Sequence, residues 1–117
     1  MNQDEYKYKV EVELGKSIRD HVSTLKSIVV RNYPMTIAKV DRVDVRADLD
    51  NVKLHHLLSG NEVEINVGGT VSMFEAKDGG TSLKYVTFWV RPAKVKFNLA
   101  NENFDVLDIS NFLPLDN

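Results

Sequence analysis

Residues 68–97 carry aromatic and basic side chains whose alternation could form a surface for binding a polyanion. Within residues 83–91, one face holds the apolar residues Val86, Phe88 and Val90, and the opposite face holds Leu83, Tyr85, Thr87, Trp89 and Arg91. A strand face exposed to water carries mostly polar side chains, so large aromatic rings beside an arginine suggest a functional surface. Such rings can stack on nucleic-acid bases, at about 1–3 kcal/mol per base. They can equally cover the end of a barrel or form a subunit interface.

Basic residues are concentrated in the same stretch. Between residues 77 and 96 the only acidic residue is Asp78, and clustered cations without matching acids are typical of phosphate binding; solvated surface lysines are the alternative. Phe74 joins the aromatic face by parity, whereas Arg42 and Arg46 are weaker candidates because aspartates flank them. The candidate nucleic-acid-binding residues are therefore Phe74, Lys77, Lys84, Tyr85, Trp89, Arg91, Lys94 and Lys96.

Several other chemistries are disfavoured by the sequence. The chain contains no cysteine, which excludes disulfides, thiol catalysis and thiolate metal sites. His55 and His56 are adjacent, so on a helix they would face about 100° apart and could not easily share one metal ion. No catalytic-triad order, phosphate-binding loop or dinucleotide-binding glycine pattern occurs. We therefore expect no enzymatic activity, no metal site and no cofactor.

The composition is that of a soluble globular protein, with 117 residues, 43% hydrophobic residues and 27% charged residues. No apolar run approaches the roughly 20 residues of a membrane span, and no signal-peptide pattern opens the chain. We therefore expect a cytoplasmic protein with no membrane contact. The net charge is −2, but residues 101–117 hold four acids and no base, which leaves residues 1–100 at +2. Such a division of charge can matter more than the total.

The hydrophobic pattern predicts a mainly β protein. Alternation predicts strands over residues 6–14, 35–47 and 63–67, with the second bent near Asp41. Helical spacing predicts helices over 18–30 and 49–58, although the β-branched residues at 28–30 keep a strand possible there. Gly68 and Gly69 are expected to form a bulge that resets the register. A hairpin then turns at residues 78–80, and Pro92 is expected to interrupt its second strand.

This order of elements fits a small OB-like five-stranded barrel with one or two short helices. A mixed α+β sheet is the alternative. We expect residues 1–100 to form the domain and residues 101–117 to form an acidic, apolar C-terminal tail.

Residues 54–97, especially LLSGNEVEINVGGTVSMFEAKDGGTSLKYVTFWV, resemble the second half of an OB-fold single-stranded DNA-binding protein. The resemblance consists of a short helix, a glycine-containing turn, a strand with the V-x-V-x-G spacing and a hairpin with a polar, glycine-containing loop. Val63, Ile65, Val67 and Gly68 stand for that spacing here, slightly displaced. The chain length and acidic tail are most similar to the short phage-encoded members, such as those of lactococcal phages.

The resemblance implies sequence-tolerant binding of single-stranded DNA in phage DNA replication or recombination, by an oligomer in the host-cell cytoplasm. The ligand could also be RNA, and the oligomer could be a dimer or a tetramer. The tail, through Phe112 and Leu113, could dock on replication or recombination proteins, or could instead pack on its own domain. The alternative function is a protein-interaction or inhibitor module that uses the same aromatic hairpin.

Overall fold

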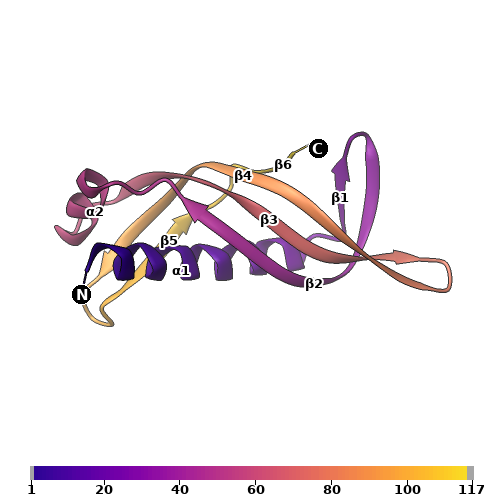
Figure 1. Cartoon of the computed structure of the whole chain (residues 1–117), viewed down its shortest axis with the longest axis horizontal. Coiled ribbons are helices and arrows are strands. Elements are labelled where there is room, and N and C mark those ends of the chain that lie inside the picture. Colours follow the sequence, from indigo (N-terminus) through magenta and orange to yellow (C-terminus); the bar gives the residue numbers. More distant parts are fainter. Residues whose placement is uncertain (1, 116–117) are drawn as a thin grey trace.

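A computed structural model describes residues 2–115, and its architecture is one antiparallel sheet wrapped along one side of a long helix (Figure 1). The described elements are, in chain order, α1 (Gln3–Thr24), β1 (Ser27–Val30), β2 (Tyr33–Ala47), α2 (Asn51–Leu58), β3 (Val63–Lys77), β4 (Gly80–Asn98), β5 (Asn103–Asp108) and β6 (Phe112–Pro114). Neighbouring strands follow the order β1-β2-β3-β4-β5, and β6 pairs with β4. Within residues 2–115, no helix has the length and apolar character that a membrane crossing requires.

The expectation of a mainly β protein is confirmed, but the sheet is open and does not close into a five-stranded barrel. Closure would require the free edge of β2 to meet a strand from the other side of the sheet. That edge meets α1 instead: Glu11 of α1 accepts a hydrogen bond from the backbone N–H of Ala47 at 2.8 Å. On its other flank α1 contacts β5, where the side-chain amide of Asn103 donates a hydrogen bond to the carboxylate of Glu13 at 3.1 Å. The helix thus occupies the space between the two sides of the sheet.

The strand predicted over residues 6–14 is wrong, because these residues form the first half of the 22-residue helix α1. The buried residues of α1 are Val10, Leu14, Ile18 and Val22, a ridge at intervals of four that packs on the sheet. Val10 and Leu14 fit a period of two as well as a spacing of four, so the alternation was ambiguous over this short window. The side chain of Asn2 caps the helix by accepting a hydrogen bond from the N–H of Glu5 at 2.9 Å.

The predicted helix over residues 18–30 is correct only as far as Thr24. The β-branched residues that follow form β1, the alternative left open by the sequence. Arg31 and Asn32 then have φ values of 53° and 59° and link Val30 to its pairing partner Tyr33, as in a tight hairpin turn with two left-handed residues. The predicted bend near Asp41 is confirmed, since the β2–β3 register shifts between Val40 and Arg42.

The helix predicted over residues 49–58 is confirmed as α2, whose N-cap is Asp50. The bulge predicted at Gly68 and Gly69 is wrong, because pairing with β4 runs unbroken through both glycines. The register shift lies between Ile65 and Val67, where the cis-linked Arg91–Pro92 pair of β4 stands opposite Asn66. Pro92 therefore does not interrupt β4, which continues to Asn98.

The hairpin of β3 and β4 has the predicted turn. Lys77 pairs with Gly80 across Asp78 and Gly79, and Gly79 has a φ of 82°, a left-handed conformation that glycine adopts without steric cost. The hairpin extends past the end of α1, and the molecule measures 51 × 24 × 20 Å (Figure 1).

The described part of residues 101–117 belongs to the sheet. β5 pairs with β4 over residues 94–98, and β6 pairs with β4 over residues 88–90. Phe104 is buried with its ring 5.1 Å from that of Phe97, and Phe112 lies 5.2 Å from Phe88. Of the two arrangements left open for the tail, the structure therefore shows the packed one for β5 and β6.

Among the glycines of the chain, Gly69 lies closest to the backbone of a neighbouring strand. A Cβ atom there would collide with the carbonyl oxygen of Asp44 and lie 3.1 Å from the ring of Phe88, whereas a Cβ at Gly68 would meet nothing nearer than 3.8 Å. We expect Gly69→Ala to lower the free energy of unfolding by about 1–3 kcal/mol through overpacking. Gly68→Ala, the matched control, should change it by less than about 1 kcal/mol. Urea unfolding of both variants measures this, and equal effects would contradict the packing described here.

Candidate nucleic-acid interface

The face of β2, β3 and β4 turned away from α1 is open to solvent, and we call it the outer face. The strand register arranges it in cross-strand rows: Arg46–Gly68–Trp89, Asp44–Thr70–Thr87, Arg42–Ser72–Tyr85 and Lys39–Phe74–Leu83. Paired residues of an antiparallel sheet point to the same side, so each row lies on one surface. The intervening residues Val67, Val71, Val86, Phe88 and Val90 are buried on the α1 side. The predicted division of β4 into an apolar face and an aromatic, basic face is therefore confirmed.

The aromatic side chains of the outer face differ in how accessible they are. Tyr85 is 66% exposed, whereas Phe74 and Trp89 are half-buried. The guanidinium carbon of Arg91 lies 3.9 Å from the centre of the Trp89 ring, a cation–π contact that covers part of the indole. Tyr85 is therefore the ring most open to stacking with a ligand, and Trp89 and Arg91 act as one composite surface.

Two adjoining hollows lie between β2 and β4 on the outer face. One has a volume of about 760 Å³ and is lined by Arg42, Arg46, Thr70 and Thr87 among others. The second, of about 480 Å³, shares Arg46 with the first and adds Arg91. Gly68 contributes to both because it carries no side chain on this surface. The missing side chain at Gly68 thus leaves a floor whose rim holds Arg42, Arg46 and Arg91 together with Asp44 and Asp48.

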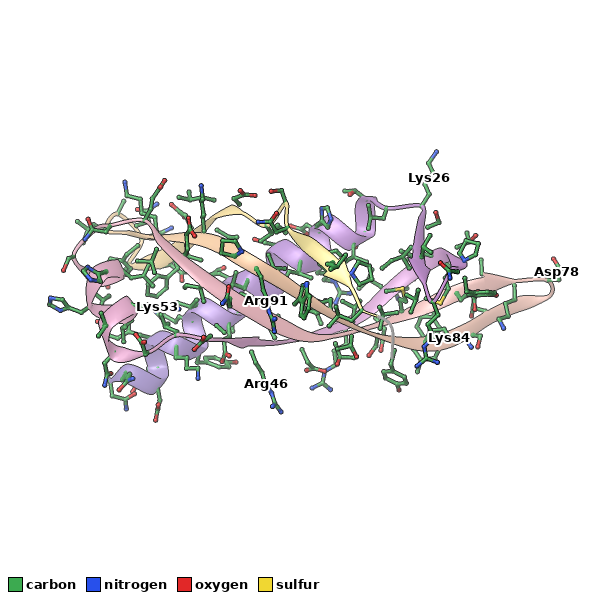
Figure 2. The ribbon with its side chains drawn as sticks, turned by 90° about the horizontal axis from the view of Figure 1, so that it is seen from above. Lys26, Arg46, Lys53, Asp78, Lys84 and Arg91 are labelled. Carbon is green, nitrogen blue, oxygen red and sulfur yellow. The ribbon has the colours of Figure 1, made fainter. Side chains whose placement is uncertain are left out.

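Positive charge predominates on the outer face. Lys39, Arg42 and Arg46 are exposed on β2, and Arg91 adds a fourth cation from β4. Asp44 is the acid within the rows, and it pairs with Arg42 at 3.0 Å. Figure 2 shows Arg46 and Arg91, two of the residues that line the hollows, near the middle of the long axis. The predicted aromatic residues are therefore joined by β2 arginines that the sequence ranked as weaker candidates.

Lys77 and Lys84, both predicted to contact phosphates, lie elsewhere. Lys84 stands opposite buried Met73, on the other side of β4 from Tyr85. Lys77 is beside the hairpin tip and lies 3.7 Å from the carboxylate of buried Glu75. The Tyr33 hydroxyl donates to the same carboxylate at 2.9 Å, and this hydrogen bond raises the pKa of Tyr33. Lys77 thus neutralises a buried acid at a distance from the hollows.

Lys94 and Lys96 face acids of β5. The register sets Lys94 opposite Asp108 and Lys96 opposite Asp105. Hydrogen bonds from Ser110, whose N–H donates to Asp108 at 2.7 Å, lower the pKa of Asp108; burial opposes the shift, and attraction by Lys94 adds to it. Acids of the predicted tail therefore offset two of the cations that the sequence assigned to phosphate binding.

Phe112 and Leu113, predicted as a partner-binding pair in the tail, point to opposite sides of the sheet. The Phe112 ring packs between Phe88 and His21 on the α1 side. Leu113 pairs with Trp89, which places it on the outer face, and it is 48% exposed. Leu113 is thus a candidate contact residue of the aromatic surface.

The sequence did not indicate which cations share a surface with the aromatic residues. Lys39 was not singled out, and Arg42 and Arg46 were ranked low because of neighbouring aspartates. The alternation of the strand could have placed the two arginines. Arg42, Asp44 and Arg46 are separated by Val43 and Val45, so the three charged side chains lie on one face of the strand. The β2–β3 register, which brings that face beside Trp89, is a long-range property that the alternation does not contain.

Metal binding finds no geometric support in the part of the chain that the structure describes. No three His, Asp or Glu side chains within residues 2–115 cluster in a way that could hold an ion. His55 and His56 are exposed on α2, and His21 packs against Phe112.

Comparisons with protein-family models, with curated proteins and with solved structures found no match to this chain.

Proposed function

We propose that the protein binds single-stranded nucleic acid on its outer face, without sequence preference, as a non-enzymatic component of DNA replication or recombination. Single-stranded DNA is the proposed ligand, and RNA is the related ligand that the experiments below compare with it. The observation that carries the proposal is the combination of Tyr85 and Trp89 with Arg42, Arg46 and Arg91 on one open sheet surface.

Phosphate binding is assigned to the arginines around the hollows. Guanidinium groups bind phosphate oxygens through charge-assisted hydrogen bonds, often two at a time. Arg46 borders both hollows, and Arg42 and Arg91 border one each. A strand that follows these residues would pass over Gly68 and Thr70, where no large side chain obstructs the backbone.

Base stacking is assigned to Tyr85 first and to Trp89 second. A strand with its phosphates on the β2 side would turn its bases toward β4, because Tyr85 shares a row with Arg42 and Trp89 shares a row with Arg46. Every base presents a π-face, so this contact tolerates any sequence. The Arg91 guanidinium on the Trp89 ring offers a further planar, cationic surface for a base.

A protein-interaction module is the second candidate function, and one observation favours it. Leu83 and Leu113 are 40% and 48% exposed on the same surface as Tyr85, and apolar side chains around aromatic rings are typical of protein-binding patches. Failure to bind oligo-dT, oligo-U or duplex DNA at low salt would favour this function over the first.

Neutralising Arg46 should weaken binding in a salt-dependent way. We expect Arg46→Gln to reduce affinity for oligo-dT by about 1 kcal/mol, or roughly fivefold. The slope of log K against log salt should become shallower by about 0.7, the value for one lost phosphate contact on a single strand. The matched control is Lys96→Gln, which removes the same charge beside Asp105 and should change the slope little. Fluorescence anisotropy across a salt series measures both, and equal slopes in the two variants would argue against the outer face.

Removing the Tyr85 ring should weaken binding by a contribution that salt does not screen. We expect Tyr85→Ala to cost about 1–3 kcal/mol on oligo-dT and oligo-U alike. Tyr8→Ala is the matched control, since Tyr8 is 68% exposed on α1, on the opposite side of the sheet. Isothermal titration measures both affinities. Equal losses for the two variants, or no loss for Tyr85→Ala, would contradict the assignment of stacking to the outer face.

A further inference from the structure

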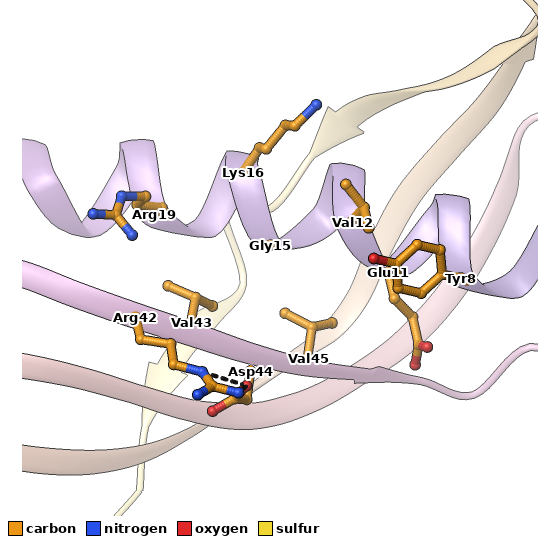
Figure 3. A pocket seen from close by; sticks show the side chains of 10 residues that line it. All are labelled: Tyr8, Glu11, Val12, Gly15, Lys16, Arg19, Arg42, Val43, Asp44 and Val45. Atoms are coloured by element: carbon orange, nitrogen blue, oxygen red, sulfur yellow. Dashed lines mark hydrogen bonds and ion pairs between the residues drawn. The ribbon is translucent and has the colours of Figure 1, made fainter.

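A groove of about 500 Å³ lies between one flank of α1 and β2 (Figure 3). Val12 and Gly15 line its middle on the helix, and Val43 and Val45 line it on the strand. A Cβ atom added at Gly15 would lie 3.7 Å from the Val45 side chain. The helix and the strand are therefore close together along the floor of the groove, and Gly15 contributes no side chain that would fill it.

The two ends of the groove differ in charge. Arg19 and Arg42 lie at one end, on opposite walls, whereas Tyr8 and Glu11 lie at the other end (Figure 3). Along the helix, Arg19 and Tyr8 are about 16 Å apart at 1.5 Å per residue. The Glu11 carboxylate accepts a hydrogen bond from the N–H of Ala47 at 2.8 Å, which holds an acid at its end of the groove. The groove therefore favours an anion at the Arg19 end and disfavours one near Tyr8.

Arg19 is held in place by neutral partners. Its guanidinium donates hydrogen bonds to the carbonyl oxygens of Val40 and Asp41 at 3.2 and 3.0 Å. These carbonyls lie at the register shift between Val40 and Arg42, where the β2 backbone leaves its regular pairing with β3. Within residues 2–115, no carboxylate lies within ion-pair distance of Arg19. The guanidinium therefore keeps its full charge in a fixed position, and three of its five N–H groups are left for an anion.

The groove adjoins the larger hollow of the outer face. Arg42, Asp44 and Val45 line both of them, so the two depressions meet across this part of β2. Arg42 belongs to the cross-strand rows of the outer face, while Arg19 reaches β2 from the α1 side. Two arginines therefore flank the same part of the β2 edge from its two sides.

Acids border the outer face in the other direction, toward β5. The strand register sets Lys94 between Glu64 of β3 and Asp108 of β5. A phosphate backbone that left the central arginines toward β5 would meet these carboxylates, which repel it. A backbone that left toward the β2 edge would meet Arg42 and then Arg19. The distribution of charge therefore favours a path over the β2 edge.

We propose that a nucleic-acid strand bound on the outer face crosses the β2 edge at Arg42 and places a further phosphate in the basic end of the groove, against Arg19. This path rests on the proposed function and extends the binding surface to α1. Phosphate oxygens accept the N–H groups of Arg19 that the two backbone carbonyls leave free. Because Arg19 is already oriented, little side-chain freedom is lost when the phosphate binds. Tyr8, beside Glu11 at the other end of the groove, lies outside this path.

The length of the oligonucleotide tests this path. Oligo-dT of about 5 nucleotides can occupy the outer face alone, and one of about 15 can also reach the groove, within the site sizes of single-strand-binding folds. We expect Arg19→Gln to leave the affinity for the short oligonucleotide unchanged and to weaken binding of the long one about fivefold. For the long one, the slope of log K against log salt should become shallower by about 0.7. Arg19→Lys keeps the charge and should keep the wild-type slope. Lys26→Gln, at an exposed position beyond the end of α1, is the control and should change neither affinity (Figure 2).

Fluorescence anisotropy with each oligonucleotide across a salt series measures these affinities and slopes. Equal effects of Arg19→Gln on both lengths would overturn the proposal, because Arg19 would then act through the fold of β2. An unchanged affinity of this variant for the long oligonucleotide would also overturn it, while the proposed function would stand if the wild-type chain binds the short one. If the wild-type chain binds neither length, the proposed function fails and this path fails with it.

Discussion

The packing of the α1 ridge against the sheet is the interaction on which the remaining structure depends. Val10, Leu14, Ile18 and Val22 are fully buried and cover the inner side of β2, β3 and β4. Because the helix fills the concave side, the sheet curves around it without closing, and α1 side chains take up backbone groups at the β2 edge. Within residues 2–115, no helix or strand covers the opposite face of the sheet. Because α1 packs against the inner side of the sheet, the large aromatic and basic side chains of the outer face stay exposed.

The glycines of β3 connect this core to the outer face. Gly69 lets β2 and the Phe88 ring approach closely on the inner side, and Gly68 leaves the outer surface flat between Arg46 and Trp89. Two adjacent residues thus serve the two sides of one strand, since successive side chains of a strand alternate between faces. The hollows between the arginines form because Gly68 carries no side chain on the outer face. The backbone of a bound nucleic-acid strand would meet the least obstruction at this glycine.

Local signals in the sequence predicted the hairpin turn, the helix α2, the bend in β2 and the two faces of β4. They failed for the first half of α1, where alternation at Tyr6, Tyr8 and Val10 suggested a strand and tertiary packing of the four-residue ridge decided the outcome. They also failed for charge. Lys94 and Lys96 are close in sequence to Trp89, yet β5 brings acids opposite them, while Arg46 is distant in sequence and shares a row with the tryptophan. Which charges meet depends on strand register, and register depends on contacts between residues far apart in the chain.

The central claim is that the outer face of the sheet binds single-stranded nucleic acid. Its most direct test is an NMR titration of the ¹⁵N-labelled chain with oligo-dT at low salt, followed through the backbone amide shifts. The largest changes are predicted in residues 42–46, 68–72 and 85–91, and the Trp89 indole N–H should shift with them. Changes confined to α1, β5 or the hairpin tip, or no changes at all, would contradict the claim.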